Sequence, residues 1–352
     1  MRYLADVKDR GIILSPDREN EKMYEWDGGG MREAIVNRVG EYYYLSYDGA
    51  MPGKTPHSYW NACTARSKDL VRWEKCGVSL YSSAITRPDA DCKDCCSASS
   101  PWSFQEDGVW YRYYLGADHC SSEGIPAFMY STMLATSSSI EGPWLKKCDQ
   151  PYSSGHVCFP AGKHGEWDDA TASPGEVLRN PKYGIAPDSK KYMMFYSGSC
   201  SGITRRSIGI ARTDDLSVTD DYYKESGNFW IKDPEPILPP SEDIENSSIY
   251  FEKDTGVYWL FTNHIYENSY TDAVWVYWTS DIDCWNPENK AIVIDRSVST
   301  WAKGAIGMPT VCPTDRGTLA VFYDGVLGKG IGHLNRHIGL AEILLPLKLH
   351  KK

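Results

Sequence analysis

Two glutamates at the starts of separate apolar segments are the first candidates for chemistry in this sequence. Glu33 opens one such segment, and Glu245 opens another 212 residues later. Cleavage of a glycosidic bond needs one carboxylic acid to protonate the leaving oxygen and one carboxylate on the other face. Crowded carboxylates also raise one of their own pKa values, which the acid requires near neutral pH. The two residue types therefore suit this reaction.

Further polar and aromatic residues stand near the same points of the pattern. Additional carboxylates that could tune the pair are Asp27, Asp169 and Glu176. Candidate substrate-binding residues are Arg32, Asp48, Asp118, His119, His264 and Asp324, and the tryptophans that could stack on a sugar face are Trp60, Trp102, Trp167 and Trp301. The triple glycine at residues 28–30 would allow close approach of the backbone to a ligand. Each acid could equally be an ordinary exposed loop residue, and each histidine a structural one.

These residues recur because the chain repeats one pattern five times after residue 25. Each copy has an entry loop, a short apolar run, a turn, an aromatic strand and a third strand of small residues, and such alternation indicates strands. The equivalent anchors are Glu33, Ser100, Ser173, Asn246 and Met308, at steps of 67, 73, 73 and 62 residues. Three of the five anchors precede proline, which favours extended backbone at the start of a strand.

Regular copies of three or four strands predict an all-β fold, a five-bladed β-propeller in one domain. Residues 1–24 are expected to be a lead-in, with a strand at 11–15 that closes the last blade. The expected blades span about residues 25–80, 97–148, 166–225, 243–290 and 304–346. Because innermost strands start at one face of a propeller, we expect Glu33 and Glu245 at matching places on blades one and four.

Composition excludes some partners. The net charge of -10 makes nucleic acid or an anionic membrane an unsuitable partner. Apolar runs of about 18 residues, which a membrane-spanning helix needs, are absent from the sequence. The charged N-terminus does not resemble a signal peptide, so we expect a cytoplasmic protein, or an exported one whose signal has been removed.

Eleven cysteines are spread through the chain, and their odd number favours reduced thiols. Cys92, Cys95 and Cys96 form a cluster that could bind zinc or cycle as a disulfide, with Cys120 or His119 completing a site in space. Carboxylate catalysis itself requires no cofactor.

The repeated motifs resemble those of the five-bladed propeller glycoside hydrolases, the superfamily around families 32, 43, 62, 117 and 130. The segments that carry the resemblance are Arg32 to Ala34, Gly40 to Leu45, Ala65 to Glu74, Tyr192 to Gly198 and Ile208 to Leu216. Together the repeats cover nearly the whole chain. The resemblance implies an enzyme that cleaves a sugar from an oligosaccharide, and some members of this superfamily hold a metal such as calcium in the channel.

By this resemblance, Glu33 occupies the place of the base or nucleophile, where family 43 has Asp, and Glu245 the place of the acid. A third Asp of that family opens blade three, but this chain has Ala172-Ser173-Pro174 there. Asp169 or Glu176 would then have to tune the acid.

Three functions remain open at this point. A hydrolase would release a terminal sugar, with furanosides among the candidate substrates. A phosphorylase would need several cations at the same mouth, for which Arg32, Arg205, Arg206 and His264 are available. A carbohydrate-binding propeller without catalysis would need neither carboxylate.

Overall fold

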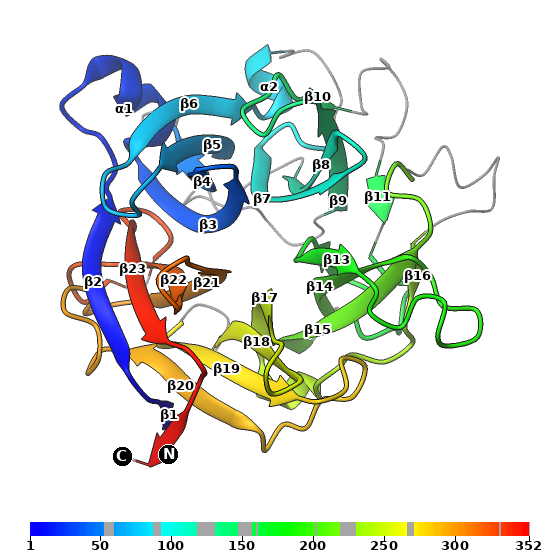
Figure 1. The fold of residues 1–352 in the computed structure, drawn as a ribbon. Helices are drawn as coiled ribbons and strands as arrows, with labels where there is room; N and C mark the ends of the chain where they lie inside the picture. Colours follow the sequence, from blue (N-terminus) through cyan, green and yellow to red (C-terminus); the bar gives the residue numbers. More distant parts are fainter. Residues whose placement is uncertain are drawn as a thin grey trace.

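Antiparallel strand units surround one central axis in the computed structural model (Figure 1). The structure describes residues 1–52, 60–86, 93–117, 131–146, 157–159, 161–200, 203–218, 230–265, 271–330 and 332–351. The predicted all-β propeller class is confirmed, since the innermost strands face the axis and each unit extends outward from it.

The first two units form a single nine-stranded sheet. The first unit contains β3 (Gly30–Val39), β4 (Tyr42–Ala50), β5 (Trp60–Ser67) and β6 (Glu74–Leu80). The second contains β7 (Ser97–Glu106), β8 (Val109–Ala117), β9 (Ser131–Ser137), β10 (Leu145–Lys146) and β11 (Val157–Phe159). One parallel pairing, Trp60 with Ser97, joins the two units.

The remaining strands form three further units. The third contains β12 (Thr171–Ser173), β13 (Val177–Arg179), β14 (Tyr192–Cys200), β15 (Ile203–Thr213) and β16 (Ile231–Lys232). The fourth contains β17 (Ile244–Glu252), β18 (Val257–His264), β19 (Ala273–Thr279) and β20 (Lys290–Asp295). The fifth contains β21 (Ile306–Pro313), β22 (Thr318–Gly325) and β23 (His337–Leu344).

The N-terminal segment completes the outer edges of the last two units. β2 (Val7–Leu14) pairs with β23 and so supplies the fourth strand of the fifth unit, where sequence analysis placed a closing strand. β1 (Arg2–Leu4) lies between β20 and β24 (Leu349–Lys351) at the edge of the fourth unit. Strands from both ends of the chain therefore hold the ring closed.

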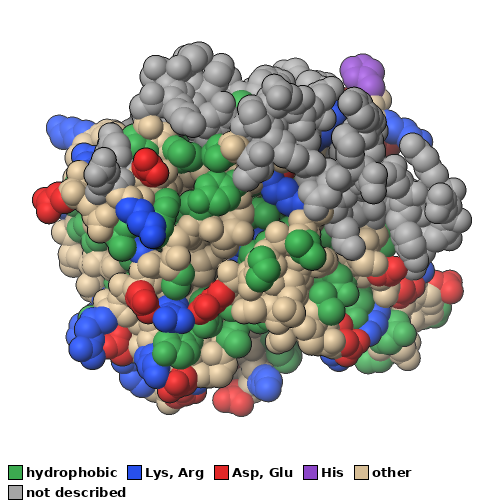
Figure 2. All heavy atoms as spheres, turned by 90° about the horizontal axis from the view of Figure 1, so that it is seen from above, with side chains coloured by type: hydrophobic (Ala, Val, Ile, Leu, Met, Phe, Trp, Pro, Cys, Tyr) green, Lys and Arg blue, Asp and Glu red, His purple; other side chains and the backbone are tan. Residues whose placement is uncertain are grey.

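Helices are few and short among the described residues: α1 (Glu21–Asp27), α2 (Ser83–Thr86) and the 3-10 helix η1 (Pro240–Glu242). Trp26 and Asp27 end α1, so this part of the predicted entry loop is helical instead. None of the described helices has the length and apolarity to span a membrane. On the face in Figure 2, acidic and basic side chains are interspersed over the described surface.

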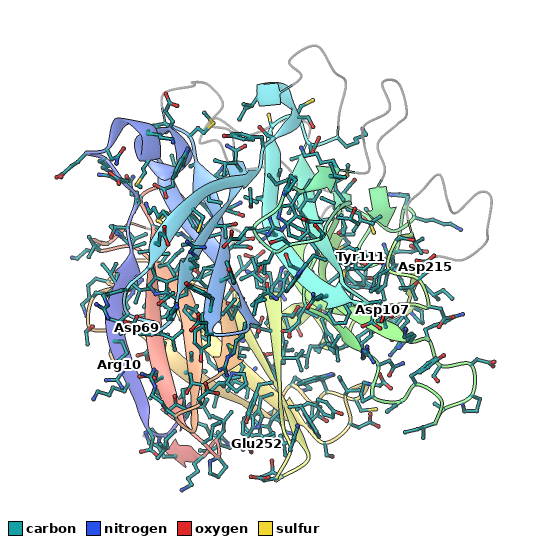
Figure 3. The ribbon with its side chains drawn as sticks, turned by 45° about the horizontal axis from the view of Figure 1, so that its top comes forward. Arg10, Asp69, Asp107, Tyr111, Asp215 and Glu252 are labelled. Carbon is teal, nitrogen blue, oxygen red and sulfur yellow. The ribbon has the colours of Figure 1, made fainter. Side chains whose placement is uncertain are left out.

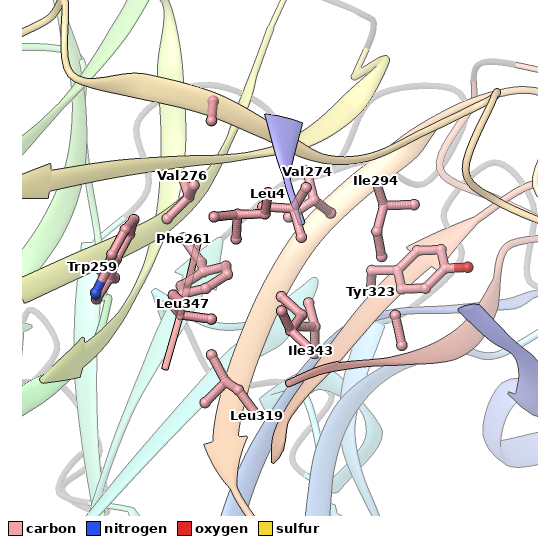
Figure 4. Close-up of a cluster of buried hydrophobic side chains, with 14 of the residues drawn as sticks. Leu4, Trp259, Phe261, Val274, Val276, Ile294, Leu319, Tyr323, Ile343 and Leu347 are labelled. Atoms are coloured by element: carbon pink, nitrogen blue, oxygen red, sulfur yellow. The ribbon is translucent and has the colours of Figure 1, made fainter. Parts of the chain in front are cut away.

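The units pack face to face, and this explains their apolar sequences. The second strand of a unit is buried on both faces, as the almost unbroken burial of β14 and β22 shows. A large apolar cluster lies between the fourth and fifth units and includes Leu4 from β1, Phe261 from β18 and Ile343 from β23 (Figure 4). Hydrophobic burial thus fixes the angle at which neighbouring units meet.

The two faces of the ring differ. Innermost strands begin at one face, which we call the pocket face, and end at hairpin turns on the other, the hairpin face. Glu252 marks the hairpin end of β17 in Figure 3, and Asp107 marks that of β7. The innermost residues of all units therefore approach one another on the pocket face.

Ile343→Ala should destabilise the protein by about 2–5 kcal/mol, because the side chain is fully buried in the cluster of Figure 4. Its neighbour Leu344 is 55% exposed, so Leu344→Ala should change stability by less than about 0.5 kcal/mol. Urea unfolding of both variants measures the difference, and equal effects would contradict this account of the core.

Candidate active site

A β-bulge opens the innermost strand in four of the five units. Pairing with the second strand shifts register between Arg32 and Ile35, Ser99 and Trp102, Glu245 and Ser248, and Gly307 and Thr310. One residue in each bulge adopts left-handed backbone: Glu33 (φ 49°), Ser100 (47°), Asn246 (63°) and Met308 (52°). Such a conformation is costly for these residue types, and the surrounding structure must hold it.

The backbone N–H of each bulge residue binds a side chain of the preceding unit. The acceptors lie on second strands: Asp48 for Ser100 (2.7 Å), Ser197 for Asn246 (3.0 Å), Asn263 for Met308 (3.1 Å) and Asp324 for Glu33 (3.1 Å). We call these four contacts the seam hydrogen bonds. Each satisfies a donor that its own sheet leaves unpaired, and each locks two units together.

The boundary between the second and third units is different. Leu115 occupies the acceptor position there, and the innermost strand of the third unit is interrupted between β12 and β13. Gly175 lies in this interruption so close to β14 that a Cβ would stand 1.6 Å from the Phe195 carbonyl oxygen. Thr132 bonds the Ala172 carbonyl across this boundary at 2.8 Å instead.

The bulges correct one sequence prediction. Arg32 pairs with Asp48 and Glu245 pairs with Asn263, so Arg32 and Glu245 occupy matching places. Glu33 instead matches Asn246, one residue further along. The two glutamates therefore do not stand at equivalent positions, although both reach the axis.

One pocket on the axis collects these residues, with a volume of about 550 Å³ including its open mouth. Its charged lining residues are Arg32, Glu33, Arg206 and Glu245. Uncharged polar lining comes from Ser100, Thr171, Ser173, Ser197 and Asn246, with His333, Leu115 and Met308 completing the wall. Each unit contributes, so the ring itself builds the pocket.

Glu33 is largely enclosed, with 11% of its side chain exposed. The Ser100 hydroxyl donates a hydrogen bond to its Oε2, and Arg32 Nε lies 3.9 Å from its Oε1. Burial raises the pKa of Glu33, the charge of Asp324 adds to the rise, and Arg32 opposes it. Glu33 thus retains a proton at higher pH than an exposed glutamate does.

Arg32 is held in place by three contacts. Its Nε donates to Asp48 Oδ2 at 3.1 Å, and its Nη1 lies 3.0 Å from His333 Nδ1. Its guanidinium also stacks over the Trp60 ring, 4.3 Å from the centroid. Trp60, predicted as a sugar platform, is fully buried and supports this arginine from below.

Glu245 stands on the other side of the mouth and has 13% of its side chain exposed. Arg206 Nη1 forms an ion pair with Glu245 Oε2. The Arg206 backbone N–H donates to Asp243 Oδ1 at 2.9 Å, which fixes the strand that carries the arginine. A charged carboxylate and a proton-retaining one therefore line the same pocket.

Asp48 and Asp324 lie behind the pocket wall and not on it. Both are almost completely buried, and each bonds a bulge N–H together with one arginine, Arg32 or Arg336. Burial raises the pKa of both carboxyls, that of Asp48 strongly, with Glu33 contributing to Asp48. Their place in the structure is that of supports for the lining residues.

Trp102 and Glu176 lie deeper along the axis. Trp102 lines a smaller recess together with Glu33, Asn246 and Met308. Glu176 Oε2 accepts from the Ile249 backbone N–H at 2.6 Å, where β17 faces the interrupted strand. Burial raises the pKa of Glu176 to about 7. Neither Trp102 nor Glu176 belongs to the lining of the main pocket.

The structure places three other candidates away from the pocket lining. Asp27 is buried in an ion pair with Lys75 at 2.7 Å. Asp169 accepts from the Gly165 backbone N–H at 2.8 Å. His264 is stacked on Trp275 and contacts the Tyr277 hydroxyl at 3.0 Å, and burial lowers its pKa to about 4.

Some predictions concern residues outside the described part of the chain. Asp118 and His119 lie there, as do Cys92 and Cys120 of the proposed metal cluster. Within the described residues, no group of three His, Cys, Asp or Glu side chains is placed to hold a metal ion. The zinc and calcium alternatives stay predictions.

Sequence analysis missed two residues at the site. His333 lines the pocket, and Arg336 bonds Asp324 Oδ1 at 2.9 Å behind it. Both lie between the second and third strands of the last unit, outside the repeated pattern. The only signal there is a glycine-rich run at residues 325–332, which favours a loop without identifying its role.

No family model matches this sequence, and a search of curated proteins found no match. The fold is similar to that of several solved glycoside hydrolases. BT0996, solved as a complex with RGII, has a TM-score of 0.69 at 17% identity, covering 96% of this chain and 92% of that one. Zg3597, a family 117 glycoside hydrolase of the marine bacterium Zobellia galactanivorans, has a TM-score of 0.61 at 17% identity, covering 96% and 90%.

A thermostable family-43 glycoside hydrolase gives a TM-score of 0.57 at 14% identity, covering 92% of this chain and 93% of that one. At these identities the likeness is one of fold. It confirms the predicted resemblance in architecture to the propeller glycoside hydrolases.

Glu176→Gln should remove a pH dependence of stability. The carboxyl titrates near 4.5 in the unfolded chain and near 7 in the folded one. Its protonated form is favoured by folding, so its stabilisation is complete below pH 4.5 and is lost as the pH rises to 7. The variant keeps an acceptor for Ile249 and should gain up to about 3 kcal/mol over the wild type between pH 4.5 and 8.

Urea unfolding at several pH values measures this gain. Glu288→Gln, at an exposed position, is the matched control and should track the wild type. A constant difference between Glu176→Gln and the wild type at all pH values would contradict the assignment.

Proposed function

We propose that this protein is a glycoside hydrolase that removes a terminal sugar from an oligosaccharide in the axial pocket. The observation that carries the proposal is the presence of Glu33 and Glu245 in one pocket. The pocket has the size of small-ligand sites, and its serine and asparagine side chains can bind sugar hydroxyls. The shared fold with glycoside hydrolases supports the same reaction class.

The charges favour roles opposite to those that the family resemblance implies. Glu33 has a raised pKa and no ion pair closer than the 3.9 Å contact with Arg32, which suits a proton donor. Glu245 is ion-paired with Arg206 and therefore stands as a carboxylate. Glu33 would protonate the glycosidic oxygen as the C–O bond breaks. Glu245 would attack the anomeric carbon or take a proton from the attacking water.

Hydrolysis is favoured over phosphorolysis by the way the arginines are paired. Arg32 binds Asp48, Arg206 binds Glu245, and Arg336 binds Asp324. A phosphate ion would have to displace a carboxylate from one of them. His264, another predicted phosphate ligand, is stacked away from the pocket, and its lowered pKa leaves it neutral at pH 7.

Leaving-group dependence tests the two roles. Glu33→Gln should lose about 10²–10⁴-fold in kcat/KM on alkyl glycosides, since no proton reaches the leaving oxygen. The loss should be much smaller on dinitrophenyl glycosides, whose leaving group departs without protonation. Glu245→Gln should be inactive on both. The substrates are alkyl and aryl pyranosides and furanosides, assayed with and without phosphate.

The pH profile gives a second check. In the wild type, the alkaline limb of kcat/KM should reflect loss of the Glu33 proton, and on the dinitrophenyl substrate Glu33→Gln should lack that limb. Equal loss on both leaving groups for Glu33→Gln would reverse the roles. Full activity in both glutamate variants would exclude this pocket as the catalytic site, and turnover only with phosphate would indicate a phosphorylase.

A further inference from the structure

The segment from residue 332 to 336, which we call the histidine turn, is packed against the start of the first unit. Asn335 N donates to the Gly29 carbonyl at 3.1 Å, and Met31 N donates to the Arg336 carbonyl at 3.3 Å. A Cβ on Gly30 would stand 2.8 Å from Asn335 N. The triple glycine was expected to approach a ligand, but Gly30 instead admits the histidine turn.

Arg336 fixes the same turn from within. Its Nη1 donates to Asp324 Oδ1 at 2.9 Å, and its Nε donates to the Gly332 carbonyl at 2.9 Å. Arg336 is fully buried, so these contacts are shielded from water. His333 is therefore carried into the pocket by a turn that is held at both ends.

The contact with Arg32 determines where the proton of His333 resides. Arg32 Nη1 lies 3.0 Å from His333 Nδ1. A guanidinium is always protonated and has no acceptor, so Nδ1 must accept through its lone pair. The single proton of the neutral ring then lies on Nε2. Because Asp48 and Trp60 fix Arg32, the ring cannot exchange tautomers without breaking this bond.

The surroundings keep the ring neutral. Burial lowers the pKa of His333 well below its usual range, and the charges of Arg336, Arg32 and Arg206 lower it further. The acidic groups of the pocket, Glu33 and Glu245, also line it with His333. Protonation would place a second cation 3.0 Å from Arg32.

We propose that His333 binds substrate through a fixed Nε2–H donor that points into the axial pocket. The ring lines the pocket, and none of the described residues forms a hydrogen bond with Nε2. This inference rests on the proposed glycoside hydrolysis. It assigns His333 the recognition of a sugar oxygen with a lone pair, such as a hydroxyl, and leaves proton transfer to the glutamates. A protonated amino sugar or a deoxy sugar offers no acceptor at that place.

Two variants separate the two sides of the ring. Asn at position 333 places an amide oxygen near the place of Nδ1 and can still accept from Arg32, but it has no donor at the place of Nε2. Gln places an amide nitrogen near Nε2. His333→Asn should lower kcat/KM by about 10- to 100-fold, and His333→Gln should be at least about fivefold better than His333→Asn.

His350→Gln, at an exposed position, is the matched control and should equal the wild type. Equal melting temperatures exclude misfolding as the cause of any loss. The proposal is overturned if His333→Asn retains wild-type kcat/KM, or if His333→Gln is no better than His333→Asn.

Nitrogen NMR of protein containing ¹⁵N-histidine tests the tautomer without any substrate. The signals of His333 are those that disappear in His333→Gln. From pH 5.5 to 8 they should show a protonated Nε2 and an unprotonated Nδ1. A protonated Nδ1 or an imidazolium at pH 7 overturns the proposal. If the Glu33 and Glu245 variants hydrolyse as well as the wild type, the proposed function fails and the substrate role of His333 fails with it, while the NMR result decides the tautomer separately.

Discussion

The hydrogen bond from a bulge N–H to a side chain of the preceding unit is the contact on which the rest of the site depends. The bulge turns Glu33 and its counterparts toward the axis, and the acceptor from the neighbouring unit holds that left-handed backbone in place. The same side chains also bind arginines: Asp48 holds Arg32 and Asp324 holds Arg336. One set of acceptors therefore joins the units and orients the pocket.

Burying so many charges at one axis is costly unless each is compensated. Asp48, Asp324 and Glu245 each have an arginine, whereas Glu33 has the Ser100 hydroxyl and a more distant Arg32. This difference in compensation separates the two pocket glutamates. Catalytic polarity in such a site arises from which carboxylate is left without a close cation, and not from residue type.

The repeat in the sequence was enough to predict strands, the propeller class and the convergence of Arg32, Glu33 and Glu245, because period-two alternation and spacing are local signals. Bulges add one residue without changing the apolar pattern, so the matching of Glu33 with Glu245 was wrong by one place. Asp48 and Asp324 were expected to bind substrate, but their partners come from neighbouring units that the sequence does not order in space. His333 lies in a turn outside the repeat, positioned by Gly30 some 300 residues away in the chain.

The pairing of β1 with β20 and β24 has a practical consequence. β1 runs parallel to β20, and β24 runs antiparallel to β1, with Arg2 opposite Lys351. In this register, both of these residues lie toward the hairpin face, side by side in Figure 1. An affinity tag, a fused domain or a solid support joined at either residue would emerge behind the ring. Immobilised protein would then present its pocket outward, accessible to the end of a long polysaccharide chain.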